Sequence, residues 1–166
     1  MLNFNYPFLQ GKSNDETAFK CLEWVRKNIK YVSDKSEYGY EEFWAYAYQV
    51  LKRKKDDCDG GSILLANLMI YNNIPAWRVR INAGDVLDPV SKKPVGHAYV
   101  TYCRESDNNW VVLDWCFYSN DYPIAERKLH KEEKDYYDLW FSFDIYHSYG
   151  NKKYLDEMLK VFKYDK

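Results

Sequence analysis

The sequence predicts one α+β domain, spanning residues 1–166, in which helices come first and an antiparallel sheet follows. Apolar residues recur at helical spacing early in the chain, as at Phe19, Leu22, Val25 and Ile29. After Pro75 the apolar period changes from about 3.6 residues to about 2. With 166 residues, 46% of them hydrophobic, the chain is long enough to bury its own core.

The first two predicted helices cover residues 14–32 and 41–52. Asn14 or Asp15 is the expected N-cap of the first, because short polar side chains accept hydrogen bonds from the first free backbone N–H groups. The second is rich in aromatic residues. A polar stretch joins the two.

The third predicted helix, 62–72, is apolar nearly all round, so it must be buried on most sides. Asp56 or Asp57 is its expected N-cap. A fourth helix, 151–164, is amphipathic and closes the chain. The sequence therefore predicts helices at both ends and one buried helix between them.

Three strands are predicted after the buried helix, at 77–82, 97–103 and 109–117. The segment 83–95 is interpreted as a long loop that forms one wall of a groove and sets specificity. Residues 119–149 are aromatic and charged without a clear period, and they receive no assignment.

Composition argues against some classes of function. The net charge of −1 gives no surplus of basic residues to neutralise phosphates, so a nucleic-acid partner is not expected. No segment approaches the roughly 18 apolar residues of a membrane span, and the N-terminus lacks a secretory pattern. Four cysteines without C-x-x-C spacing read as free thiols, which favours a cytoplasmic protein.

Cys58 stands at the mouth of the buried helix, in KDDCDGG, rather than inside the apolar run. The positive end of a helix dipole favours a thiolate there, and the free N–H groups of the first turn can hold an oxyanion. Asp56, Asp57 and Asp59 act in the opposite direction, because nearby negative charge raises a thiol pKa. A general base is therefore needed for Cys58 to act as a nucleophile.

His97 is the best candidate base among three histidines. His130 lies in a charged stretch and is expected to face water, and His147 has no informative context. Asp114 is an acid in an otherwise apolar strand, where an unpaired carboxylate is costly, so it is the natural partner of His97. Cys58, His97 and Asp114 then form a nucleophile, a base and an orienting acid.

Hairpin geometry permits this pairing. Direct opposition of His97 and Asp114 requires a turn centred between Glu105 and Ser106, inside the polar stretch RESD. A register shifted by two residues would place the two side chains diagonally on the same face, still within reach of each other.

Metal sites have weaker support. A calcium loop with Gly60 in its glycine position would put Lys55 first and Ala66 last, and neither is a ligand. The cysteine spacings give no zinc site. A metal site built from Cys58, His97 and Asp114 remains an alternative, but no cofactor is expected.

Five ordered motifs resemble the transglutaminase-like superfamily, in its bacterial, archaeal and phage cysteine-peptidase-like branch. They are the Trp-containing FWAYAYQ, the cysteine turn DDCDGG, RVRINAG, GHAYVTY and NWVVLDW. They cover about residues 29–118, and 119–166 would be a C-terminal extension. The sequence departs from the family pattern at Asp56, where glycine is usual, and at Tyr99, where tryptophan is common.

The resemblance implies a papain-like fold, with a buried Cys-bearing helix packed on an antiparallel sheet. It also implies that Cys58 is the nucleophile, His97 the base and acid, and Asp114 the orienting acid. A second oxyanion donor would come from an upstream side chain, with Trp44 the first candidate and Gln49 the second. Trp44 is equally well interpreted as a core anchor.

The expected function is thiol-dependent acyl transfer on a peptide or protein substrate, through an acyl-enzyme at Cys58. Hydrolysis of an amide or peptide bond is favoured over transamidation, because no second site for an amine is evident. A catalytically silent domain that binds a peptide or protein is the alternative. A phage or host-interaction component is a third interpretation, and the oligomeric state stays open.

Overall fold

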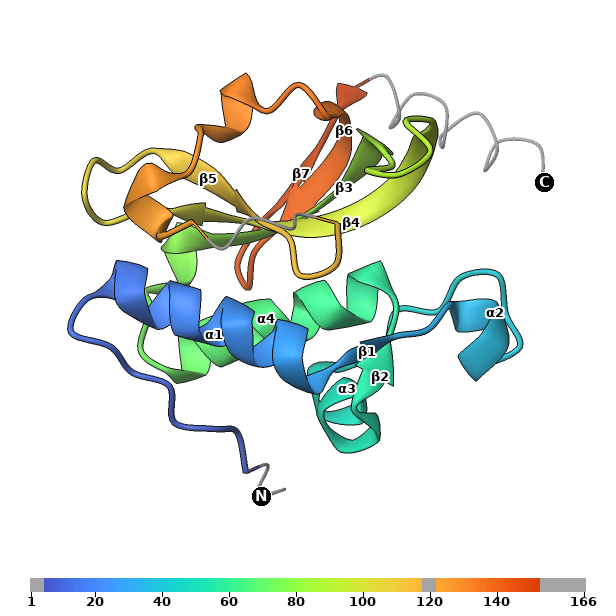
Figure 1. Ribbon diagram of the computed structural model, residues 1–166, viewed down its shortest axis with the longest axis horizontal. Helices are drawn as coiled ribbons and strands as arrows, with labels where there is room; N and C mark the ends of the chain where they lie inside the picture. The colour runs from blue at the N-terminus through green and yellow to red at the C-terminus, as the bar shows by residue number, and fades with distance from the viewer. Residues whose placement is uncertain (1–4, 118–121, 153–166) are drawn as a thin grey trace.

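The computed structural model describes residues 5–117 and 122–152, which form two layers (Figure 1). A sheet makes the upper layer, and the helices α1 and α4 lie beneath it. Most of the predicted helix 151–164 falls outside the described residues. Within the described part of the chain, no helix is long and apolar enough to cross a membrane.

The first helix, α1 (Asn14–Asn28), ends four residues before the predicted end at residue 32, and its N-cap lies before the two predicted cap residues. Ser13 is its N-cap, and the Ser13 side chain accepts a hydrogen bond from the backbone N–H of Glu16. Asn14 and Asp15, the predicted caps, instead bond to the loop around Glu105. One face of α1 is buried against α4.

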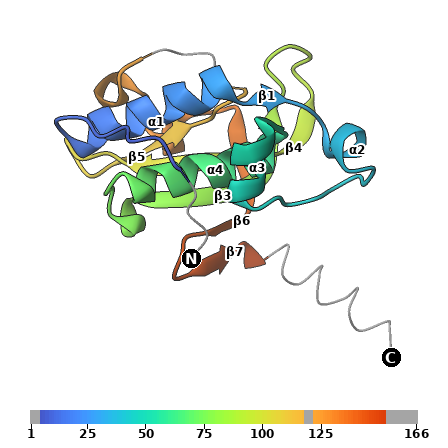
Figure 2. The ribbon, with the colours of Figure 1, turned by 90° about the horizontal axis from the view of Figure 1, so that it is seen from below.

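The Cys-bearing helix, α4 (Cys58–Tyr71), is capped by Asp57, as the sequence predicts. Its leucines Leu64, Leu65 and Leu68 are fully buried. Figure 2, which views the molecule from the helix side, shows α4 crossing the sheet with α1 and α3 beside it. The prediction of a buried helix bearing Cys58 on an antiparallel sheet is confirmed.

The predicted helix 41–52 is shorter than expected, because α3 covers only Ala47–Arg53. In the irregular segment before it, the Phe43 N–H donates to the Asp34 carboxylate. The Tyr46 N–H donates to the side chain of Gln49, which starts the helix there. These side-chain acceptors replace the backbone hydrogen bonds of the missing turns.

Three short elements frame α3. The helix α2 (Asp34–Glu37) follows β1 (Lys30–Tyr31), and β1 pairs in parallel with β2 (Lys55–Asp56). This pairing places the start of α4 beside the segment that follows α1.

The main sheet has five antiparallel strands in the order β5-β4-β3-β6-β7. Its strands are β3 (Val79–Leu87), β4 (Pro94–Cys103), β5 (Trp110–Leu113), β6 (Tyr136–Phe143) and β7 (Ser148–Gly150). The short 3₁₀ helices are η1 (Ala76–Arg78), η2 (Ile124–Glu126) and η3 (His130–Glu132). The first predicted strand therefore begins at Val79, after Trp77.

The prediction of a loop over 83–95 is wrong. β3 runs on to Leu87, which pairs with Pro94, so only residues 88–93 form the turn. Gly84 explains why the strand was missed, since a Cβ there would lie 2.3 Å from the Asp138 carbonyl oxygen of β6. A glycine where a neighbouring backbone approaches closely has no side chain, so it interrupts the alternation of apolar residues by which a strand is predicted.

The β4–β5 register differs by two residues from direct opposition of His97 and Asp114. Val100 pairs with Leu113, and Cys103 pairs with Trp110. Continuing this register places Asp114 opposite Tyr99, diagonal to His97. The alternative register allowed by the sequence is therefore the one adopted.

The start of α4 packs tightly against the residue that follows Asp114. A Cβ on Gly61 would lie 2.1 Å from the Trp115 ring, and the Trp115 indole N–H donates to the Cys58 carbonyl at 3.3 Å. Trp115 is only 5% exposed, so its ring has little room to move aside.

We therefore expect Gly61→Ala to lower the free energy of unfolding by about 1–3 kcal/mol, because the added methyl overpacks this contact. Urea unfolding followed by circular dichroism measures the change. Asn67→Ala, at an exposed position of the same helix, is the control and should stay within about 0.5 kcal/mol of wild type. Equal midpoints for Gly61→Ala and wild type would contradict the packing described.

Candidate active site

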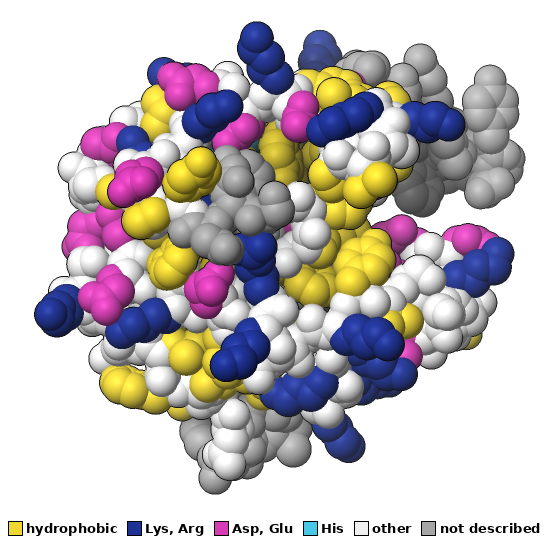
Figure 3. Space-filling model, in the orientation of Figure 1, with side chains coloured by type: hydrophobic (Ala, Val, Ile, Leu, Met, Phe, Trp, Pro, Cys, Tyr) yellow, Lys and Arg dark blue, Asp and Glu magenta, His cyan; other side chains and the backbone are white. Residues whose placement is uncertain are grey.

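Cys58 and His97 line one cavity of about 110 Å³ at the start of α4. Trp44, Asp59 and Trp140 contribute to the same wall. The space-filling view shows a hollow between the sheet and the elements below it, with hydrophobic side chains on its wall (Figure 3). The structure therefore brings the predicted nucleophile and the predicted base to one site.

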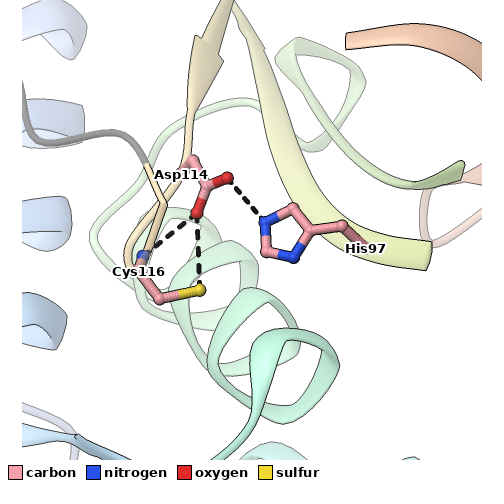
Figure 4. Close-up of side chains that lie close together, drawn as sticks. All are labelled: His97, Asp114 and Cys116. Carbon is pink, nitrogen blue, oxygen red and sulfur yellow. Dashed lines mark hydrogen bonds and ion pairs between the residues drawn. The ribbon is translucent and has the colours of Figure 1, made fainter. Parts of the chain in front are cut away.

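His97 and Asp114 form a buried pair (Figure 4), in which Nε2 of His97 lies 2.6 Å from Oδ2 of Asp114. Their side chains are 1% and 0% exposed. The Phe117 ring stacks on the imidazole at a centroid distance of 3.9 Å. Packing and hydrogen bonding therefore fix the plane of the His97 ring.

The Asp114 carboxylate is held by further donors. Its Oδ1 accepts the backbone N–H groups of Cys116 and Phe117, each at 3.0 Å, and its Oδ2 accepts the Tyr136 hydroxyl at 2.8 Å. Burial alone would raise its pKa, but His97 and these N–H groups outweigh burial and lower the pKa to about 2.

An ionised Asp114 can only accept hydrogen bonds, which makes Nε2 of His97 the donor. In neutral His97 the second ring nitrogen, Nδ1, then carries a lone pair. Among the described residues, Nδ1 has no hydrogen-bond partner. The arrangement leaves Nδ1 free to take a proton.

The Cys58 thiol is not activated by its surroundings. Burial raises its pKa, and the charges of Asp57, Asp59 and Asp114 raise it further. A hydrogen bond from the Ala98 backbone acts in the other direction without offsetting them. Burial and the neighbouring carboxylates therefore both act against the thiolate form of Cys58.

The acids around Cys58 do not act as one group. Asp56 is fully buried and accepts the Tyr38 hydroxyl at 2.7 Å. Asp57 and Asp59 instead gather with Asp34, and one carboxylate oxygen of each lies within 4.8 Å of the others.

The cluster of Asp34, Asp57 and Asp59 carries uncompensated oxygens. One oxygen of Asp34 and both oxygens of Asp59 are buried and accept no hydrogen bond from an N–H group or a hydroxyl among the described residues. A protonated Asp59 can donate to the Asp57 carboxylate. Burial, with the neighbouring carboxylates, raises the pKa of Asp59 to about 9 and that of Asp34 to about 6. Without a cation, the cluster lowers its charge by taking up protons.

The two oxyanion candidates lie in different places. Trp44 lines the cavity, but its indole N–H donates to the Glu42 carboxylate at 2.8 Å. The Gln49 side chain accepts the Tyr46 N–H at 2.9 Å and lies outside the cavity. The structure therefore brings Trp44 to the site and leaves Gln49 at the start of α3.

The expectation that His130 faces water is wrong. His130 is half-buried, and its Nε2 lies 3.1 Å from the Tyr99 hydroxyl. His147 is exposed beside Asp144, away from the cavity. Sequence reasoning also missed Tyr136, because it lies in the stretch that showed no clear period.

The structure groups other residues than the predicted Cys58, His97 and Asp114 as possible metal ligands. His97 and Asp114 are grouped with Cys116, not Cys58, and their ligand atoms lie within 4.8 Å of one another. The Cys116 sulfur lies 3.6 Å from Oδ1 of Asp114 (Figure 4). Nε2 of His97 and the Asp114 carboxylate already bond to each other, so these atoms have partners without an ion.

The low pKa of Asp114 predicts a stability change in acid. The unfolded side chain has a pKa of about 3.9, so its contribution is complete above that pH and is lost as the pH falls toward 2. The raised pKa values of Asp34 and Asp59 have the opposite effect at higher pH. The folded state then holds protons that the unfolded state has released, so the free energy of unfolding falls as the pH rises.

We expect the stability difference between wild type and Asp114→Asn to shrink by about 2 kcal/mol between pH 5 and pH 2. Urea unfolding at a series of pH values measures this difference. Glu41→Gln, at an exposed position, should track wild type throughout. A difference that stays constant with pH would mean that Asp114 is not selectively ionised in the folded state.

Comparisons with known proteins agree with the fold described above. The profile of the family described as "Transglutaminase-like superfamily" matches residues 4–115, more than half of the chain. No curated protein matches the chain.

Among solved structures, three of LapG from Legionella pneumophila share the fold. The EGTA-treated form has a TM-score of 0.66 at 13% identity, covering 87% of this chain and 71% of that chain. A second LapG structure has a TM-score of 0.65 at 14% identity, covering 93% and 80%. The calcium-bound form has a TM-score of 0.58 at 14% identity, covering 92% of each.

The helix α4 that starts at Cys58, its packing on the antiparallel sheet and the match to the family profile agree. The chain belongs to the transglutaminase-like superfamily.

Proposed function

We propose that this protein is a thiol hydrolase that cleaves amide or peptide bonds through an acyl-enzyme at Cys58. The observation that carries the proposal is the shared cavity of Cys58 and His97, with Asp114 bound to the far nitrogen of the imidazole. This is the order of groups that nucleophilic catalysis requires.

In the proposed reaction, Nδ1 of His97 takes the proton of the Cys58 thiol as the sulfur attacks the substrate carbonyl carbon. The N–H groups of the first turn of α4 stabilise the oxyanion. His97 then gives its proton to the leaving amine, and the thioester remains on Cys58. Water, deprotonated by His97, hydrolyses the thioester and restores the thiol.

Asp114 serves this reaction as a positioning and charge-stabilising group. Its carboxylate keeps Nε2 protonated and lies 2.6 Å from the ring that becomes imidazolium. Tyr136, with its hydroxyl 2.8 Å from the same oxygen, supports Asp114. Both act through His97, since neither lines the cavity.

Hydrolysis is favoured over transamidation because the cavity is small, at about 110 Å³. Trp44 and Trp140 give it an aromatic wall, which suits an apolar side chain of a peptide or protein substrate. The competing interpretation is a domain that binds a peptide without turnover, and it is favoured by the protonated state of Cys58.

We expect Cys58 to form a covalent acyl adduct with members of a peptide library, and mass spectrometry of quenched reactions should detect it. Cys58→Ala should abolish peptide cleavage. His97→Ala should lower its rate by a factor on the order of 10³ or more. Methylamine in the reaction separates the two outcomes, because transamidation would attach it to the acyl product. Cys21→Ala, in the core, tests whether another thiol contributes.

The same experiment can reject the proposal that this protein is an enzyme. Peptide binding without an adduct, with equal affinity in wild type and His97→Ala, would establish the silent binding domain instead.

We also propose that a divalent cation at Asp34, Asp57 and Asp59 supports this activity. One LapG structure is described as calcium-bound, and this chain gathers carboxylates of the kind that calcium prefers. A bound cation would replace the protons that the buried carboxylates of Asp34 and Asp59 otherwise hold. A bound cation would supply positive charge beside Cys58 and so lower the pKa of the thiol.

We expect calcium to speed iodoacetamide alkylation of Cys58 at pH 7 on the order of tenfold relative to EGTA, and to raise the melting temperature. In EGTA at pH 7, Asp59→Asn should alkylate at about the wild-type rate, because the raised pKa of Asp59, about 9, already keeps that side chain neutral. The variant should no longer respond to calcium. Peptide mass spectrometry identifies the thiol, and thermal melts give the second measurement.

The control for the cation is Glu41→Gln, an exposed acid outside the cluster. It should respond to calcium as wild type does. A calcium response that persists in Asp59→Asn would place the cation elsewhere, and the absence of any response in wild type would remove it from the mechanism.

A further inference from the structure

A second cavity, of about 260 Å³, lies on the face of the sheet that is turned away from α4. It is larger than the cavity at Cys58, and β3, β4, β5 and β6 all contribute to it together with η3. None of its lining residues belongs to the proposed catalytic group.

Arg80 is the main charged group in this cavity. Its guanidinium lies 4.6 Å from the Trp110 ring centroid and 4.4 Å from that of Tyr149, so two aromatic rings hold it. Its Nε atom is buried without a hydrogen-bond partner, and no carboxylate pairs with it among the described residues. Arg80 is therefore oriented but not neutralised.

The other groups around Arg80 add hydrogen-bonding capacity and no negative charge. Lys131 is the second charged side chain of the lining, and no acidic residue belongs to that lining. Ser142 is 4% exposed, and its hydroxyl has no partner within the described ranges. Asn82 is held by Thr101, at 3.0 Å from amide nitrogen to hydroxyl oxygen. The site thus has cations, neutral polar groups and aromatic walls.

We propose that this cavity binds a carboxylate group carried on an apolar body, with Arg80 as its principal partner. The planar guanidinium matches a carboxylate and is already ordered before binding. Trp110 and Leu129 provide contact for the apolar part. Either a peptide C-terminus or an acidic side chain would present this chemistry.

His130 supplies a reporter for occupancy, because it lines the cavity and is half-buried. Its Nε2 already lies 3.1 Å from the Tyr99 hydroxyl. An anion beside the imidazole would raise its pKa, which burial now holds below the usual range. Binding should therefore shift the His130 ring resonances.

The test is a titration of the full chain with N-acetylphenylalanine and with its neutral amide, followed by NMR of the His130 ring and by calorimetry. The acid should give a saturable shift, and the amide should bind at least tenfold more weakly. Arg80→Gln should weaken the acid at least tenfold, because a charge-assisted hydrogen bond is lost. Lys134→Gln removes one exposed charge outside the lining and should bind as wild type does.

N-acetylglutamate α-amide separates the two sources of the carboxylate. Binding at least as tight as that of N-acetylphenylalanine would assign the site to acidic side chains, and weaker binding would assign it to chain ends. Equal binding of acid and amide by wild type would overturn the proposal. Unchanged affinity in Arg80→Gln would do so as well. Should Arg80→Gln fail to fold, Lys131→Gln and the acid–amide comparison in wild type still decide it.

Discussion

The candidate active site depends on one buried carboxylate. Asp114 is completely inaccessible to solvent, so its charge survives only because His97, Tyr136 and two backbone N–H groups all bond to it. Those donors come from β4, from β6 and from the turn after β5. The orientation of the His97 imidazole therefore depends on the correct folding of all three elements.

At Cys58, the predicted nucleophile, the surroundings do not stabilise the charged form. Several buried carboxylates lie close to Cys58, and one result is a thiol with a raised pKa. A helix N-terminus stabilises a thiolate by a modest amount, and burial next to several carboxylates exceeds it. The predicted base, His97, is thus held in place by its hydrogen bond to Asp114, whereas the surroundings of the predicted nucleophile, Cys58, favour its neutral form. This asymmetry is what a cation at Asp34, Asp57 and Asp59 would remove.

The sequence was most informative where a residue conflicts with its local pattern. Cys58 at the start of an apolar helix and Asp114 in an apolar stretch both conflict with packing, and the structure places both beside His97. The predicted strand 109–117 is shorter, because β5 ends at Leu113, just before Asp114. Asp34 was not singled out because it lies in a polar stretch where an acid is ordinary, and β1–β2 pairing brings it to Asp57 and Asp59. The strand around Gly84 was missed because close approach of backbones leaves no side-chain period.

The position of the cavity follows from strand alternation. His97 shares the sheet face of Tyr99, whereas Cys58 belongs to the helix layer on the other face. The pairing of β4 with β5 stops at Val100, so His97 lies in the part of β4 beyond the end of β5. Small residues of β3 and β4 line the cavity there: Ala83, Gly96 and Ala98. A Cβ on Gly96 would lie 2.8 Å from the Trp140 ring. Glycine at this position therefore allows Trp140 to form the wall while the space between Cys58 and His97 stays open.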